Sequence, residues 1–397
     1  MKRNKTIKIK RSKSRLYKKK KSTAKVAAET IVFVLIAGAL VFVGYAAAGP
    51  IINYLSTEDS GTVTDWTPEE SSQPEEIDPQ ATDTQPDEVT AEEEVSQGLG
   101  SYLLSESALS NQSTLTAQLK NAKEMGFKEV IIPLKQNSGD FLYKSNISYI
   151  KDTDLIKGSM PAGQIISAAK AQGLTAKALI PTLMDANSPS YAEDTGYRFA
   201  DDSYGWLDAA AANGGKRWID PFLDGTKRYY GDIAKELIGA GFEEVILAQV
   251  RFPAFWDDDK KWLDARNFTE TRYTELTAFY NSVYNASGQK TSVEIDINDV
   301  LNGYGESFES TAEILKDKNF TGTVYLRVNP DDFPENRLEV GENKFMGLSP
   351  DTVNKTKTLV NKAAEYIGTN VTVVPVIVTD GLTEEEVTGC YKALAVQ

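Results

Sequence analysis

The chain has 397 residues and a net charge of −14, with 43 Lys and Arg against 57 Asp and Glu. It contains no histidine and a single cysteine, Cys390, which excludes Ser-His-Asp and Cys-His catalysis, imidazole metal sites, intramolecular disulfides and zinc–thiolate clusters. Carboxylates, Lys, Arg, Tyr and amides must supply any chemistry, and carboxylates alone suffice for glycoside hydrolysis. We expect no metal ion and no cofactor.

The chain begins with a basic tail, residues 1–29, which carries 13 Lys and Arg and no acid up to Lys25. Residues 30–52 are uncharged, and at about 1.5 Å per residue they could cross a hydrocarbon core about 30 Å thick. No Lys or Arg follows until Lys120, so the positive-inside rule predicts a single-pass signal-anchor helix in the cell membrane, with the N-terminus cytoplasmic and the C-terminal domain extracytoplasmic. A cleaved signal peptide is the alternative.

Residues 53–97 predict a disordered linker, because their many acids and four prolines stand among Ser and Thr without any Lys or Arg. The remainder, 98–397, has a net charge of −12 and repels phosphate backbones, so we expect no nucleic-acid partner there. The basic tail suits contact with anionic lipid headgroups better than nucleic-acid binding. An exported domain without a disulfide suits a Gram-positive-type cell envelope.

From residue 98 onward, strand and helix patterns alternate, which predicts an α/β fold, a (β/α) TIM-like barrel. The expected strands are Gly98–Leu104, Glu129–Leu134, Leu174–Pro181, Glu244–Arg251, Thr291–Ile297, Gly322–Val328 and Val371–Val378. The expected helices are Ser113–Met125, Pro161–Gln172, Gly225–Ala240, Thr269–Asn285, Ser307–Lys318, Ser349–Ile367 and Thr383–Val396. Either the barrel lacks its eighth unit or a strand escapes the pattern, and an open doubly wound sheet is the alternative fold.

Both folds place a ligand site at the carboxyl ends of the strands. Polar residues at these ends are Lys135, Asp185, Arg251, Glu294, Asp296, Asn298, Arg327, Asn329 and Asp380. Alternation with period two places Glu294, Asp296 and Asn298 on one face, which would line the barrel lumen with Arg327 as partner. Glu294 and Asp296 could be a catalytic pair, retaining or inverting, or part of a network with Arg327 that only closes the barrel.

The segment Trp218–Pro253 (WIDPFLDGTKRYYGDIAKELIGAGFEEVILAQVRFP) resembles the signature of a bacterial glycoside hydrolase family related to amylase-type barrels. In that family a Trp-x-Asp-Pro segment leads into a helix, and a strand ends in Asp-Tyr-x-Arg-Phe-Pro. The likeness is weaker at Val130–Ser145, Leu174–Asp185 and Thr291–Ile297. With the strand-end positions, it implies a glycan or polysaccharide ligand held by Lys135, Asp185, Trp218, Asp220, Gln249, Arg251, Arg327 and Asn329.

This chain departs from the family pattern at strand four, where Ala248 stands in place of aspartate and Gln249 in place of tyrosine, and at Pro133, which stands in place of the acid of strand two. Analogy with amylase-type barrels implies that the missing aspartate is the nucleophile. We therefore keep two hypotheses for the cavity, beside a third in which the chain is a structural or regulatory membrane protein whose ectodomain only spaces or scaffolds partners. The first is a membrane-anchored glycoside hydrolase that uses Glu294 and Asp296 on cell-envelope polysaccharide, with Arg251 orienting the substrate. The second is an inactive barrel that binds glycan or an envelope protein.

Four tryptophans cluster in the loops after the third and fourth strands: Trp206, Trp218, Trp256 and Trp262. Aromatic faces of this kind either stack on sugar rings or fill the space beneath long loops. The sequence leaves both roles open. It indicates no particular protein partner.

Overall fold

The computed structural model describes residues 99–199, 205–301, 312–334, 336–341 and 344–395. The segments predicted as basic tail, transmembrane helix and linker therefore lie outside the described residues. Within these ranges, no helix combines the length and the apolar character that crossing a bilayer requires.

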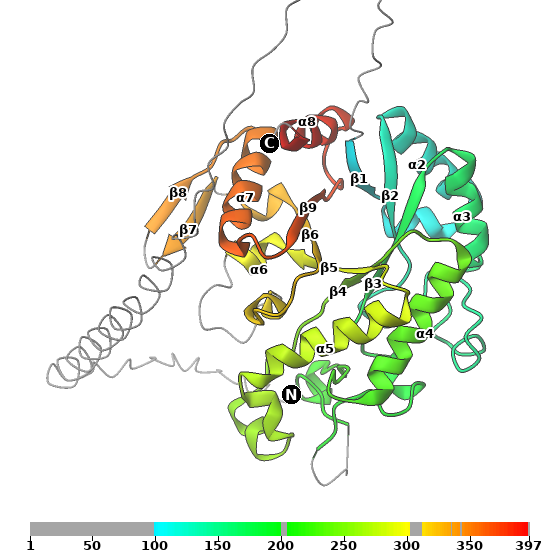
Figure 1. Cartoon of the computed structure of the whole chain (residues 1–397), viewed down its shortest axis with the longest axis vertical. Coiled ribbons are helices and arrows are strands. Elements are labelled where there is room, and N and C mark those ends of the chain that lie inside the picture. Colours follow the sequence, from blue (N-terminus) through cyan, green and yellow to red (C-terminus); the bar gives the residue numbers. More distant parts are fainter. Residues whose placement is uncertain (1–98, 200–204, 302–311, 335, 342–343, 396–397) are drawn as a thin grey trace, which may run out of the picture. The chain divides into compact units, whose positions relative to one another are not determined.

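Seven parallel strands form one sheet that curls into a nearly closed barrel (Figure 1). The strands are β1 (Leu99–Leu103), β2 (Phe127–Pro133), β3 (Thr175–Pro181), β4 (Val245–Ala248), β5 (Thr291–Asp296), β6 (Thr323–Val328) and β9 (Thr372–Ile377). The seven predicted strands are confirmed. Neighbours in the sheet follow chain order without reversal, so the doubly wound alternative is wrong.

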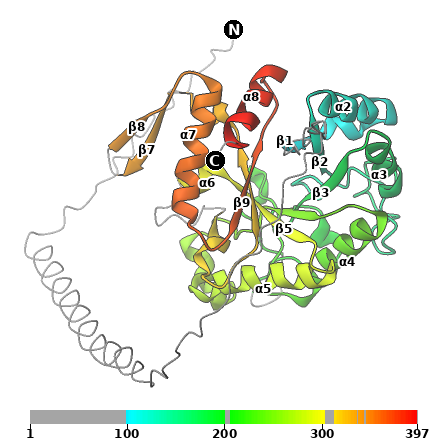
Figure 2. The same ribbon diagram turned by 45° about the horizontal axis from the view of Figure 1, so that its top comes forward.

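Helices surround this sheet on its outer side (Figures 1 and 2). They are α2 (Gln112–Glu124), α3 (Ala162–Ala171), α4 (Asp224–Ala240), α5 (Thr271–Ala286), α6 (Ile297–Leu301), α7 (Thr352–Ile367) and α8 (Glu384–Ala395). Six of the predicted helices match, whereas the short α6 was not predicted. Of the predicted Ser307–Lys318 helix, 307–311 lie outside the described residues and the rest contains a 3₁₀ turn, η6 (Glu313–Lys316). The hairpin of β7 (Arg337–Gly341) and β8 (Lys344–Gly347) was also missed.

The seam between β1 and β9 is where an eighth strand would stand in a complete barrel. No strand of the described residues fills it. Helix α8 covers the seam, and the buried Tyr391 hydroxyl donates to the Ser101 carbonyl at 2.7 Å and accepts from the Ile377 amide at 3.1 Å. One side chain thus joins the two edge strands of the described sheet.

The lumen of the barrel is filled in layers by residues that alternate along the strands, as the pleat requires. An apolar layer contains Ile131, Leu179, Ile246, Ala248, Tyr325 and Val376. Towards the amino ends of the strands, Lys177 binds Glu129 at 2.7 Å and the Tyr325 hydroxyl at 2.8 Å. Tyr325 in turn donates to Glu244 at 2.6 Å. This network closes the barrel floor and leaves the opposite end for a ligand.

Candidate functional site

A cavity of about 640 Å³ opens at the carboxyl ends of the strands. It is lined by Leu103, Leu104, Ser105, Glu106, Ser107, Pro133, Lys135, Asn137, Leu179, Pro181, Ala248, Gln249, Glu294, Asp296, Arg327, Val378, Thr379 and Asp380. Six of the residues predicted from the sequence therefore meet at its wall: Lys135, Gln249, Glu294, Asp296, Arg327 and Asp380. Parallel strands bring their ends to one edge, which explains why residues so distant in sequence converge.

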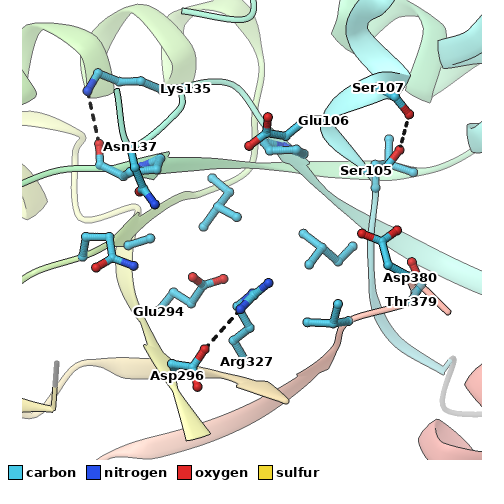
Figure 3. A pocket seen from close by; sticks show the side chains of 18 residues that line it. Ser105, Glu106, Ser107, Lys135, Asn137, Glu294, Asp296, Arg327, Thr379 and Asp380 are labelled. Carbon is cyan, nitrogen blue, oxygen red and sulfur yellow. Dashed lines mark hydrogen bonds and ion pairs between the residues drawn. The ribbon is translucent and has the colours of Figure 1, made fainter. Parts of the chain in front are cut away.

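Glu294, Asp296 and Arg327 form the polar centre of this cavity (Figure 3). Arg327 donates to Asp296 Oδ2 at 3.1 Å, from the position beside it on β6. Asp296 Oδ1 also accepts the Asn298 backbone amide at 2.9 Å and the Asn298 side-chain amide at 3.1 Å. Asp296 is thus held in place by one cation and two amide donors.

Glu294 lies deeper in the barrel than Asp296, two residues earlier on the same strand. Burial raises the pKa of Glu294 to about 7, the positive charge of Arg327 opposes the rise, and the negative charge of Asp296 adds to it. Below a pH of about 7, therefore, the protonated form of Glu294 predominates, beside Asp296 and its partner Arg327. Two carboxyl groups with such different surroundings are the usual basis for dividing acid and base roles.

Lys135 lines the cavity, but its ammonium group is fully buried and faces the carboxylate of Asp185, which is also fully buried. Asp185 accepts from the backbone amide of Ser188 at 2.9 Å, and the chain at Gly139 packs so closely that a Cβ there would overlap Asp185. An unpaired buried charge costs about 3–5 kcal/mol, so this pair stays together and supports the wall of the cavity.

Ala248 is the last residue of β4 and Gln249 follows it, and both line the cavity. Leu247 pairs with Val293 across β4 and β5, so the next residues, Ala248 and Glu294, lie side by side. Ala248 therefore contributes only a methyl group beside the carboxyl of Glu294. Gln249 has a left-handed backbone with φ 55°, which is uncommon for a residue with a side chain and occurs most often at functional sites.

Five residues predicted to bind substrate do not line this cavity: Asp185, which is buried against Lys135, and the four that follow. Trp218 and Arg251 lie in an adjacent hollow, with the guanidinium group of Arg251 5.3 Å from the Trp218 ring. Asp220 is buried, and its burial raises its pKa to about 7. Asn329 caps the short 3₁₀ helix η7 (Pro330–Asp332) and donates to Asp332 at 2.8 Å.

Several cavity residues were not predicted: Ser105, Glu106, Ser107, Asn137 and Thr379. Three of them belong to the turn after β1 and to the 3₁₀ helix η1 (Glu106–Ser110) that follows it. The candidates were chosen as polar residues near the carboxyl ends of the predicted strands. Glu106 lies shortly after the first strand, so the same criterion would have selected it. In Figure 3, Glu106 and Asp380 stand across the cavity from Glu294.

Four carboxyl groups line the cavity, Glu106, Glu294, Asp296 and Asp380, while Arg327 is paired with one of them. Such a site disfavours anionic ligands and favours neutral or positively charged ones. A protonated carboxyl next to an ionised one, in a concave pocket, can bind hydroxyl-rich ligands and can exchange protons with them.

Comparison with known proteins gives one family. Residues 101–314 match the family model described as "Putative glycosyl hydrolase domain". None of the curated proteins compared with the chain matches it.

Distant similarity to solved structures extends over the barrel. The structure of a hypothetical protein from Ruminiclostridium thermocellum is 17% identical, covering 49% of this chain and 96% of its own, with a TM-score of 0.41. The PgaB (BpsB) glycoside hydrolase domain from Bordetella bronchiseptica is 13% identical over 68% of this chain and 81% of its own, with a TM-score of 0.42. The catalytic domain of beta-amylase from Paenibacillus polymyxa is 11% identical over 75% and 97%, with a TM-score of 0.41.

The matched segment spans more than half of the chain and contains the first five strands of the barrel, up to and including Glu294 and Asp296. The chain therefore belongs to this glycosyl hydrolase domain family.

Proposed function

We propose that this protein hydrolyses glycosidic bonds in the cavity at the carboxyl ends of the barrel strands. The observation that carries the proposal is the raised pKa of Glu294, about 7, beside the carboxylate of Asp296 that Arg327 balances. Membership of a glycosyl hydrolase domain family supports it.

In the proposed reaction, the protonated carboxyl of Glu294 donates its proton to the glycosidic oxygen, and the bond from that oxygen to the anomeric carbon breaks. Asp296 accepts a proton from a water molecule, whose oxygen bonds to the anomeric carbon. This scheme is that of an inverting glycosidase, in which one carboxyl acts as acid and the other as base. The products are a free reducing end and an alcohol, and solvent returns the protons.

The substrate class we propose is a neutral or positively charged polysaccharide, because the cavity is rich in carboxyl groups. We further propose that residues 30–52 anchor the protein in the cell membrane and that the barrel acts outside the membrane on cell-envelope polysaccharide. The uncharged run of 30–52, with 13 Lys and Arg before it and none after it until Lys120, supports this orientation.

A second candidate function is glycan binding without hydrolysis, and Ala248 favours it. A methyl group cannot act as a nucleophile, and Ala248 lies beside Glu294 where the family pattern has an aspartate. The cavity would then retain a sugar through Glu294, Asp296 and Arg327 and leave it intact.

The deciding experiment compares hydrolysis with binding, using the full-length protein and neutral oligosaccharides. We expect Glu294→Gln and Asp296→Asn each to lower the release of reducing ends about 10²–10⁴-fold, because each removes one proton-transfer group. Calorimetry should show that both variants still bind. Glu365→Gln, a change of an exposed acid on α7, is the control and should leave the rate unchanged.

Two outcomes would contradict hydrolysis in different ways. Wild-type protein that binds oligosaccharide without releasing reducing ends would leave glycan binding as the function. Wild-type protein that binds none of them would overturn both candidates.

A further inference from the structure

Trp256 is the most exposed large apolar side chain of the described residues, with 63% of its surface accessible. Its ring is nevertheless fixed, because the indole nitrogen donates to the Asp208 carbonyl at 2.9 Å. The Trp256 backbone amide also donates to Asp259 at 2.7 Å, at the start of the 3₁₀ helix η4 (Asp257–Lys261). A large aromatic face that is exposed and held in one orientation is available for stacking on a ligand.

A hollow of about 660 Å³ adjoins this ring. It is lined by Asp208, Ala209, Trp218, Arg251, Ala254, Phe255 and Trp256. Asp208 organises it, because its carboxylate accepts from the Trp218 indole at 2.9 Å while its carbonyl accepts from Trp256. The guanidinium group of Arg251 stacks over Trp218 in the same hollow. The lining therefore combines an aromatic face with charged groups.

That combination matches the chemistry of a sugar. A pyranose presents C–H groups on the face of its ring, which pack on an aromatic surface, and hydroxyl groups at its edge, which pair with charged and amide groups. A purely apolar partner would not match the polar edge that Arg251 and Asp208 give the hollow, whereas a strongly charged partner would gain little from Trp256.

The hollow lies close to the central cavity along the chain. Gln249 lines the cavity and Arg251, two residues later, lines the hollow, so at most about 7 Å of backbone separates these two lining residues. This proximity makes an oligosaccharide that reaches both sites the simplest ligand to propose.

We propose that the hollow beside Trp256 is a second sugar-binding subsite, which holds a distal unit of an oligosaccharide whose other end lies in the central cavity. This inference rests on the proposed function, since it takes the cavity to bind sugar. It assigns to Trp256 a stacking role and to Arg251 a hydrogen-bonding role at the edge of the sugar ring.

The test measures affinity as a function of oligosaccharide length, using full-length protein and neutral disaccharides and hexasaccharides of glucose and N-acetylglucosamine. We expect Trp256→Ala to raise the Kd of the hexasaccharide about tenfold and to leave the Kd of the disaccharide unchanged. Trp256→Phe, which keeps an aromatic face, should restore most of the affinity. Trp262→Ala is the control, because Trp262 is 55% exposed but lines neither the cavity nor the hollow.

The outcomes separate this inference from the function on which it rests. If wild-type protein binds the hexasaccharide and Trp256→Ala binds it equally well, the subsite is overturned and the central cavity is not. If the wild-type protein binds no oligosaccharide, both are overturned. If Trp256→Ala weakens the disaccharide as much as the hexasaccharide, Trp256 does not hold a distal unit, and the inference is also overturned.

Discussion

Glu294 and Asp296 differ by one carbon and stand two residues apart, yet their surroundings give them different charges. Asp296 has Arg327 and two Asn298 donors, whereas no described side chain donates a hydrogen bond to Glu294 that would compensate its burial. The strand alone cannot produce this difference. It arises because Asp296 is the last residue of β5, next to the chain turn that brings Asn298 back to it.

The raised pKa of Glu294 has a consequence for stability. It is about 7 in the folded protein against a usual 4.5, so the stabilising contribution of the protonated group is complete below pH 4.5 and is lost as the pH rises to about 7. Glu294→Gln cannot lose a proton. We therefore expect the free energy of unfolding of the variant, relative to wild type, to increase between pH 4.5 and 7 and to level off above.

Urea denaturation at a series of pH values measures this difference, with Glu365→Gln as the matched change of an exposed acid. A difference between Glu294→Gln and wild type that does not vary with pH would show that Glu294 ionises normally.

The sequence predicted part of the site at this scale and missed the rest for physical reasons. Alternation along β5 correctly brought Glu294 and Asp296 to the lumen, because the pleat is a local property. It could not show that Lys135 and Asp185 bind each other, because that pairing depends on how the chain after β2 folds back. The close approach at Gly139 that permits the pairing is likewise a tertiary contact.

At the scale of elements, the barrel is closed by a helix side chain. The Tyr391 hydroxyl forms a hydrogen bond with a backbone group of each edge strand, the Ser101 carbonyl of β1 and the Ile377 amide of β9. We expect Tyr391→Phe to lower the free energy of unfolding by about 2 kcal/mol, because it leaves these buried groups without their partner. Urea denaturation checks this value. The control is Tyr191→Phe, at a position that is 40% exposed, which should change the free energy of unfolding by less than about 0.5 kcal/mol. Equal effects of the two changes would exclude the role of Tyr391 in joining β1 and β9.

Helices and strands with a clear sequence pattern were predictable, whereas elements that depend on tertiary contacts were not. A capping box begins α8, where Thr383 and Glu386 exchange hydrogen bonds at 2.9 and 3.2 Å. By contrast, α6 has five residues and the β7–β8 hairpin two short strands, too few for a hydrophobic period to stand out. The seven strands of the barrel sheet were predictable, but the contacts of Tyr391 with both edge strands were not, because they are tertiary contacts.

At the scale of the whole molecule, the barrel has a cluster of charged residues at each end. The network of Lys177, Glu129 and Glu244 closes the floor, and the carboxyl-rich cavity opens at the other end, with an apolar layer between them. The sequence left open whether Glu294 and Asp296 belong to a closing network. Their place in an open cavity, far along the strands from the floor, favours a role in binding and chemistry.

The most direct test of the account is the pH dependence of kcat/KM for the release of reducing ends from a neutral oligosaccharide by the full-length protein. We expect kcat/KM of the wild type to fall as the pH rises through about 7, because Glu294 then loses the proton it donates, and we expect Glu294→Gln to lack activity at every pH. A Glu294→Gln variant with the kcat/KM of the wild type would contradict the central claim.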